Sequence, residues 1–197
     1  MAERFLEEGA IGKRPSWDEY FMALAIVIAS RSSCKHVKSG SVLTQDRQIV
    51  GTGYNGAAPG IEENCLDAGC RKEAKGLAYE NSLGSGECIG IHSEMNALGN
   101  LNKRRTNGVT LYTTIFPCHS CAKNLMPYDV ERVIYKSAYS KGELSSTLEL
   151  FELGNVEIDR LDLSPERFVD ILFGRPGEKF DIWPPEQRAL IEKIRKQ

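Results

Sequence analysis

Apolar residues recur at helical spacing near the start of the chain. Ser16 and Glu19 stand just before this stripe at the spacing of a capping box, in which each side chain satisfies a free backbone N–H group of the other residue. The members of the stripe are Tyr20, Leu24, Val27 and Ile28. Three- and four-residue steps place such side chains on one face of a helix. The pattern predicts a buried helix over residues 17–33.

Short runs rich in β-branched residues follow this helix. Residues 42–43 and 48–54 are expected to form two strands joined by a turn at 45–47. Further along, the expected elements are helices at 92–103, 118–125 and 143–153 and strands at 110–113, 132–135 and 156–158. Pro117 is a favourable start for the second of these helices. Alternating strands and helices indicate an α/β layered sheet with at least one parallel pair.

Two regions lack this clear alternation. Residues 55–90 show little periodicity, and an irregular segment of that length is expected to be functional or held by another group. Beyond residue 160 the sequence predicts helices at 165–172 and 185–196, separated by a Gly- and Pro-rich break at 174–177. We therefore expect one domain over 1–160, with an irregular cysteine-rich insertion at 57–90. Residues 161–197 are expected to form a helical extension on the surface or at a subunit contact.

Composition and charge narrow the class of protein. The chain has 197 residues, 41 % of them hydrophobic and 26 % charged, which is typical of a globular protein and excludes a disordered or fibrous one. Lys and Arg number 25 and Asp and Glu 27, giving a formal net charge of −2. This balance argues against a general nucleic-acid binder, which usually carries a basic surplus.

The N-terminal residues mix charges and show no secretory signal, so a cytoplasmic protein is expected. The longest apolar run, residues 21–29, is far shorter than the ~20 residues that cross a bilayer, so no membrane partner is expected. In a reducing compartment, the six cysteines suggest metal binding or catalysis rather than disulfides.

The strongest chemical signal is the pair of motifs His92-Ser-Glu94 and Pro117-Cys118-His-Ser-Cys121. One imidazole and two thiolates suit zinc and leave one tetrahedral position open. Because Pro117 starts a helix, both sulfurs are expected near free backbone N–H groups, which favour thiolates. Glu94 is not needed as a ligand and remains free to act on a water.

This arrangement predicts metal-assisted hydrolysis. Zinc lowers the pKa of a bound water from about 15.7 towards ~7. Glu94 can accept the proton and pass it to a leaving group, acting first as a base and then as an acid. The pattern H-x-E…P-C-x-x-C is the known signature of zinc nucleobase deaminases. The alternatives are a structural zinc knuckle and an accidental pair of cysteines.

The same segments resemble one family. HSEMNAL at 92–98 and TTIFPCHSCAK at 113–123 are similar to the zinc motifs of the cytidine and deoxycytidylate deaminase superfamily. GTGYNG at 51–56 resembles the deoxycytidylate branch, as do the cysteine-containing segment 65–71 and Cys88. The resemblance covers about residues 17–160.

The resemblance implies a three-layer α/β/α cytidine-deaminase-like fold with a central mixed sheet of about five strands. It also implies hydrolytic deamination of dCMP to dUMP and ammonia, a reaction that feeds thymidylate nucleotide synthesis. By the same resemblance, His92, Cys118 and Cys121 bind the catalytic zinc and Glu94 is the proton shuttle.

Several residues are candidates for substrate binding. The resemblance assigns Asn55 to the sugar, although an Asn-Gly pair is also typical of a turn. Asn96 lies either on the helix surface or in the wall of the site. Lys38 and Tyr139 are our candidates for the phosphate, with Arg31 and Arg71 as alternatives; for any single cation a solvated surface role is equally expected.

Two positions depart from the family pattern. Ser93 stands where the family usually has alanine, a small change that we expect to be tolerated next to a zinc ligand. Ser39 stands where an apolar residue is preferred, which we expect to weaken local packing without touching a ligand.

The four remaining cysteines, Cys34, Cys65, Cys70 and Cys88, match a closed structural zinc site. A metal there would organise the irregular segment, because its binding free energy contributes to folding. Some family members have a second zinc near this region, and His36 is an alternative ligand. The other interpretation is that these four are buried or free thiols.

The resemblance also implies an oligomeric enzyme that is regulated by nucleotides. Members of the deoxycytidylate branch are often hexamers, activated by dCTP with Mg²⁺ and inhibited by dTTP, and their GYNG segment is implicated in the effector site. Tyr54 and Gly56 are therefore candidate effector residues. The competing interpretations are a zinc deaminase acting on a nucleoside, a base or tRNA, and a non-catalytic zinc module. The near-neutral charge disfavours tRNA.

Overall fold

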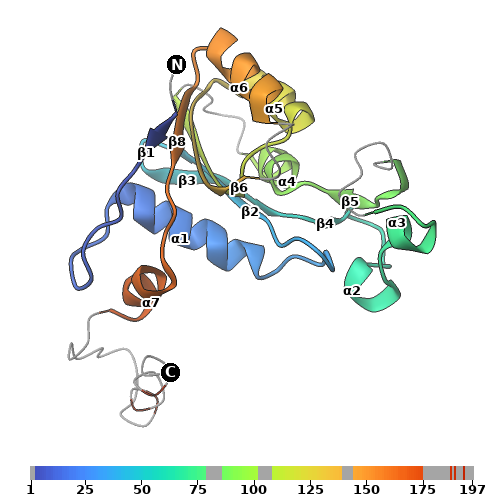
Figure 1. Ribbon diagram of the computed structural model, residues 1–197, viewed down its shortest axis with the longest axis horizontal. Coiled ribbons are helices and arrows are strands. Elements are labelled where there is room, and N and C mark those ends of the chain that lie inside the picture. The colour runs from blue at the N-terminus through green and yellow to red at the C-terminus, as the bar shows by residue number, and fades with distance from the viewer. Residues whose placement is uncertain are drawn as a thin grey trace.

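A mixed sheet of six strands forms the centre of the protein (Figure 1), in the order β1-β8-β7-β6-β2-β3. The computed structural model describes residues 3–78, 86–101, 108–138 and 144–174, together with the single positions 187, 189 and 193. The strands of this sheet are β1 (Arg4–Phe5), β2 (Gly40–Gln45), β3 (Gln48–Tyr54), β6 (Val109–Ile115), β7 (Val130–Ser137) and β8 (Glu157–Arg160). β6, β7, β8 and β1 run parallel to one another, and β2 pairs antiparallel with both β3 and β6.

Helices cover both faces of this sheet (Figure 1). The main helices are α1 (Trp17–Ala29), α4 (Ser93–Gly99), α5 (His119–Leu125), α6 (Leu144–Leu153) and α7 (Pro165–Phe173). The short elements are β4 (Gly56–Ala57), β5 (Gly90–Ile91), α2 (Cys65–Ala68), α3 (Arg71–Ala74) and the one-turn helix η2 (Met126–Tyr128).

Two cores lie on opposite faces of the sheet, because successive strand side chains point to opposite sides. Val42, Tyr112 and Ile134 enter the core formed with α1 and α7, and their neighbours Leu43, Leu111 and Val133 enter the core formed with α4, α5 and α6. The predicted three-layer α/β/α class is confirmed. No helix in the described parts of the chain has the length and apolar character to cross a membrane.

The sequence-based element boundaries differ from the structure in two informative places. The sheet has six strands rather than about five, because β1 pairs with β8 and two residues are too few to show periodicity. Helix α1 ends at Ala29, not at residue 33. There the Ser30 hydroxyl donates to the Val27 carbonyl at 2.6 Å, and the next backbone N–H groups bond three residues back, which tightens and ends the helix.

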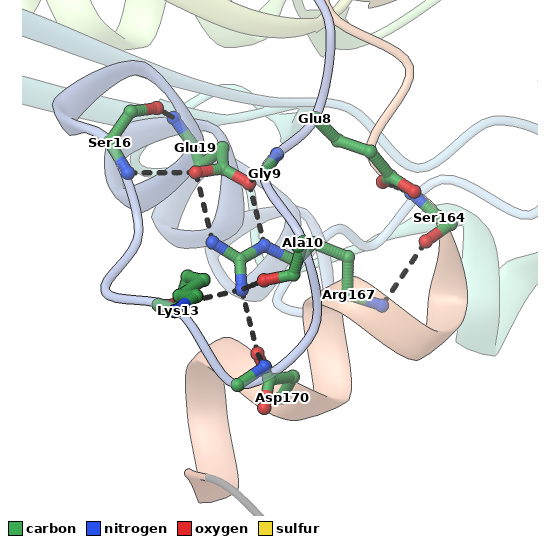
Figure 2. Close-up of polar contacts among 10 residues, drawn as sticks. Glu8, Gly9, Ala10, Lys13, Ser16, Glu19, Ser164, Arg167 and Asp170 are labelled. Atoms are coloured by element: carbon green, nitrogen blue, oxygen red, sulfur yellow. Dashed lines mark hydrogen bonds and ion pairs between the residues drawn. The ribbon is translucent and has the colours of Figure 1, made fainter.

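Helix α7 is anchored to α1 by a buried arginine (Figure 2). The Arg167 guanidinium is fully buried and donates to both carboxylate oxygens of Glu19, at 2.6 and 3.1 Å, and to Asp170 at 2.7 Å. Two of its other hydrogen bonds go to the carbonyls of Ala10 and Lys13. The helix of the predicted extension is therefore packed against α1 and the N-terminal loop.

Glu19 also completes the predicted capping box with Ser16, which the structure confirms. Burial disfavours its ionised form, but the hydrogen bonds from Arg167 and from the backbone of Ser16 and Gly9 outweigh this and bring the pKa of Glu19 down to about 2. One carboxylate thus holds together a helix start, a loop and a distant helix.

Candidate active site

The three predicted ligands of the catalytic zinc come together at the amino-terminal ends of α4 and α5. His92 is the N-cap residue of α4 and Cys118 is the N-cap residue of α5, with Cys121 in the first turn of α5. The His92 Nδ1 atom lies 3.5 Å from Cys118 Sγ and 3.3 Å from Cys121 Sγ. Tetrahedral zinc with ordinary Zn–N and Zn–S bonds sets this separation at about 3.6 Å. The donor set therefore fits zinc in both chemistry and spacing.

The chain reaches this site along β6. After that strand the Phe116 N–H bonds to the Ser137 carbonyl of β7 at 2.8 Å, and Pro117 leads into α5. Cys118 Sγ then accepts from the Cys121 N–H at 3.5 Å, as an N-cap side chain does. The helix start predicted from Pro117 is thus the feature that presents both sulfurs.

The two sulfurs share a proton unequally. Donation from the Cys121 thiol lowers the pKa of Cys118, burial opposes this, and further hydrogen bonds from His92 and the Cys121 backbone bring it down to about 4. The same sharing, together with burial, raises the pKa of Cys121. At neutral pH at least one sulfur is therefore a thiolate, the form that zinc requires.

Glu94 is buried beside the ligand set and is only 5 % exposed. It stands in the first turn of α4, two residues after His92. The pKa values of His92 and Cys121 are raised first by their hydrogen bonds with Cys118, and the charge of Glu94 raises both further. Burial raises the pKa of Glu94 itself. A carboxylate in such surroundings is suited to accept and release a proton.

Helix α4 carries this machinery and lies unusually close to the edge strand β3. Added Cβ atoms on Gly51 and Gly53 would collide with the backbone of α4, mainly at Ala97. The Asn96 side chain donates to the Tyr54 carbonyl at 2.7 Å, and the Asn100 side chain donates to the Thr52 carbonyl at 2.9 Å. Sequence reasoning missed the two glycines, although alternate glycines in a strand are a signal of close backbone approach.

We expect Gly53→Ala to displace α4, and His92 and Glu94 with it. The collision is with backbone, so overpacking should cost about 1–3 kcal/mol of the free energy of unfolding, with weaker zinc retention. Gly99→Ala is the matched control, because an added Cβ at Gly99 in the same helix meets nothing within 4 Å. Urea unfolding and metal analysis of both variants test this; equal stability and zinc content in the two would contradict the close-packing role.

The substrate candidates occupy different places. Asn55 holds a loop: its side chain accepts from the Ser39 N–H at 2.7 Å and donates to the Val37 carbonyl at 2.8 Å. Lys38 is exposed on the same loop. Tyr139 lies outside the described residues.

The two effector candidates lie next to one another in sequence but differ in exposure. Tyr54 is exposed at the end of β3, and Gly56 is buried in β4. A Cβ on Gly56 would press against the Ser33 hydroxyl. Gly56 therefore has a packing role, in addition to its predicted role in effector binding.

The four other cysteines are all free thiols. Burial raises the pKa of Cys65, and the proximity of Cys34, Cys70 and Cys88 raises it further. Among the described residues, however, the compact ligand group here is His36, Cys70 and Glu73, whose ligand atoms all lie within 4.8 Å of one another. Of the four predicted cysteines only Cys70 belongs to this group, which also includes His36, the predicted alternative ligand. Helix α3 places Glu73 next to His36, with their side chains 3.2 Å apart.

The site offers three ligands and leaves one tetrahedral position open for a water. A buried carboxylate that is not needed as a ligand lies beside it. This arrangement defines a zinc-dependent hydrolytic site rather than a closed structural zinc knuckle. The family model described as the cytidine and deoxycytidylate deaminase zinc-binding region matches residues 15–137. The chain belongs to this family.

Individual relatives agree with this assignment. A deoxycytidylate deaminase of Mycobacterium phage D29 is 38 % identical over 128 residues, covering 62 % of this chain and 95 % of the relative. The Mus musculus deoxycytidylate deaminase is 31 % identical over 169 residues, covering 83 % and 91 %. A solved dCMP deaminase of cyanophage S-TIM5, in complex with dCMP and dUMP, has the same fold, with a TM-score of 0.60, 24 % identity and coverage of 75 % and 98 %.

Proposed function

We propose that this protein catalyses the zinc-dependent hydrolytic deamination of dCMP to dUMP and ammonia. The observation that carries the proposal is the convergence of His92, Cys118 and Cys121 beside the buried Glu94. The curated deoxycytidylate deaminases among its relatives support dCMP as the substrate.

In the proposed reaction a water adds to C4 of the cytosine ring, and the bond from C4 to the exocyclic nitrogen breaks. A zinc ion held by the three ligands would supply the Lewis acid that makes this water acidic at neutral pH. Glu94 accepts a proton from the water and delivers it to ring N3 as the C4–O bond forms. It then carries the remaining proton from the C4 hydroxyl to the exocyclic nitrogen, which leaves as ammonia while the C4 oxygen becomes the carbonyl of dUMP. Burial keeps Glu94 beside the ligands and away from bulk water, so that the proton stays within the site.

A substrate panel tests the proposal. The chain is incubated with cytidine, deoxycytidine, CMP, dCMP and dCTP, and the loss of cytosine absorbance is followed. We expect dCMP to be turned over best. Preferential turnover of deoxycytidine would overturn the substrate but leave the zinc chemistry intact, and no turnover at all would favour the non-catalytic zinc module. Repeating the dCMP assay with dCTP and Mg²⁺, or with dTTP, tests regulation through Tyr54 and Gly56.

We also propose a second zinc in the region that contains Cys70. Two ligand sets compete for it: the four cysteines Cys34, Cys65, Cys70 and Cys88, and the compact group of His36, Cys70 and Glu73. Thiolate and imidazole ligands suit zinc in either set. Such a metal would organise α2 and α3, which have no buried residues of their own.

Metal analysis distinguishes the two sets. We expect two zinc ions per chain in the wild type and one in Cys70→Ser, because both sets contain Cys70. In Cys65→Ser the second zinc is lost if the cysteines hold it and retained if His36 and Glu73 do. One zinc per chain in all three proteins would rule out the second site.

A further inference from the structure

A cluster of buried hydroxyl groups lies directly behind Glu94. We name it the hydroxyl cluster, and its members are Ser39, Ser41, Ser93 and Thr113. The Ser93 oxygen lies 2.7 Å from the Ser39 oxygen, 2.8 Å from the Ser41 oxygen and 3.0 Å from Glu94 Oε2. Ser41 reaches on to the Thr113 hydroxyl at 3.1 Å, and Thr113 donates to the Ile115 carbonyl at 3.0 Å.

The cluster is thoroughly buried. Ser41, Ser93 and Thr113 have no exposed surface, and Ser39 is 7 % exposed. Burying four hydroxyls costs free energy unless each finds a partner, and here they partner one another across β2, β6 and α4. The cluster therefore holds a fixed arrangement.

Ser39 and Ser93 are the two positions that the sequence analysis singled out as unusual for the family it resembles. They are 54 residues apart in sequence, and the structure brings their hydroxyls together in one buried hydrogen bond. Each hydroxyl therefore supplies a partner for the other in the interior.

Ser93 has a single hydroxyl proton to donate. It donates this proton to Glu94 Oε2 at 3.0 Å. With the Ser93 proton donated to Glu94, the Ser39 hydroxyl donates to the Ser93 oxygen, while Ser41, which lies 2.8 Å from that oxygen, donates its own proton to Thr113. This ties one carboxylate oxygen of Glu94 to the sheet.

We propose that Ser93, held by Ser39 and Ser41, is a positioning residue that fixes the orientation of the Glu94 carboxylate for proton transfer. This inference rests on the proposed deaminase function, in which Glu94 moves the proton.

Ser93→Ala removes the donor to Glu94 but no ligand. We expect kcat for dCMP to fall about tenfold or more, as is typical when a residue that hydrogen-bonds to a group of the active site is removed. KM should stay within about twofold of the wild type, and the zinc content should not change. Thermal stability should also fall, because the hydroxyls of Ser39 and Ser41 lose a partner.

The triple variant Ser39→Ala/Ser41→Ala/Ser93→Ala separates positioning from stability. It leaves no orphaned serine hydroxyl in the cluster, so its midpoint of thermal unfolding should recover towards the wild type while kcat stays as low as in Ser93→Ala. If Ser93→Ala does not fold, the kcat of the triple variant tests the positioning role instead. Thr147→Val, which removes a fully buried hydroxyl from α6, is the matched control and should leave kcat unchanged.

Three results would overturn the inference: a kcat of Ser93→Ala within twofold of the wild type, a loss of zinc from Ser93→Ala, or recovery of kcat together with stability in the triple variant. Failure of the proposed function would look different, because the zinc-loaded wild type itself would then release no ammonia from dCMP.

Discussion

Replacing Glu94 with glutamine is expected to leave zinc bound and to remove nearly all deamination. The amide has almost the same shape as the carboxylate and can still accept a hydrogen bond from Ser93, whose oxygen lies 3.0 Å from Glu94 Oε2. It cannot accept a proton from water or return one to the leaving nitrogen. General acid–base catalysis typically contributes 10²–10⁴-fold, so kcat should fall by about that factor.

The measurement is kcat for dCMP together with the zinc content and thermal stability of the same preparation. Glu166→Gln is a matched control, because Glu166 is exposed in the first turn of α7, away from the ligands. Glu94→Gln that keeps both zinc and more than a tenth of the wild-type turnover would show that another group moves the proton.

Arg167→Ala is expected to be the most destabilising single change outside the zinc site. It leaves the buried carboxylates of Glu19 and Asp170 without their cation and removes the donor to two backbone carbonyls. Removing one partner of a buried ion pair typically costs about 3–5 kcal/mol. Because Glu19 also caps α1, both that helix and α7 should loosen (Figure 2).

Urea unfolding checks this expectation. Lys136→Ala is the matched control, because it breaks an exposed ion pair with Asp162 at 2.9 Å that should contribute at most about 1 kcal/mol. If Arg167→Ala does not fold, Arg167→Lys keeps the charge, loses the forked geometry and should show an intermediate loss. Equal losses in the arginine-to-alanine and lysine-to-alanine variants would contradict the anchoring role.

Local sequence signals were enough to predict the features that depend on neighbouring residues. The capping box of Ser16 and Glu19, the helix start after Pro117 and the alternation of strands and helices are all present. Such features depend on hydrogen bonds within one turn and on the period of each element. The motifs also predicted that His92, Cys118 and Cys121 lie together, and their ligand atoms are all within 4.8 Å of one another.

Features that join distant segments were missed. Arg167 lies in the predicted helix 165–172, within the segment expected on the surface or at a subunit contact, yet its partner Glu19 lies 148 residues earlier. Ser39 and Ser93 each looked like a minor departure, and their meaning appears only when β2 and α4 bring them together. A single polar side chain shows no periodic pattern in the sequence, so its burial cannot be predicted from its neighbours. Whether it is solvated or buried depends on the tertiary contact.

The most direct measurement is ammonia release from dCMP by the wild-type chain in three states: zinc-loaded, stripped by a chelator, and reloaded with zinc. Turnover should be clear in the first state, fall to background in the second and return in the third, because in the proposed function His92, Cys118 and Cys121 hold the metal on which the hydrolysis depends. Undiminished ammonia release from a chain that metal analysis shows to be free of zinc, or none from the loaded chain, would contradict a zinc-dependent deaminase.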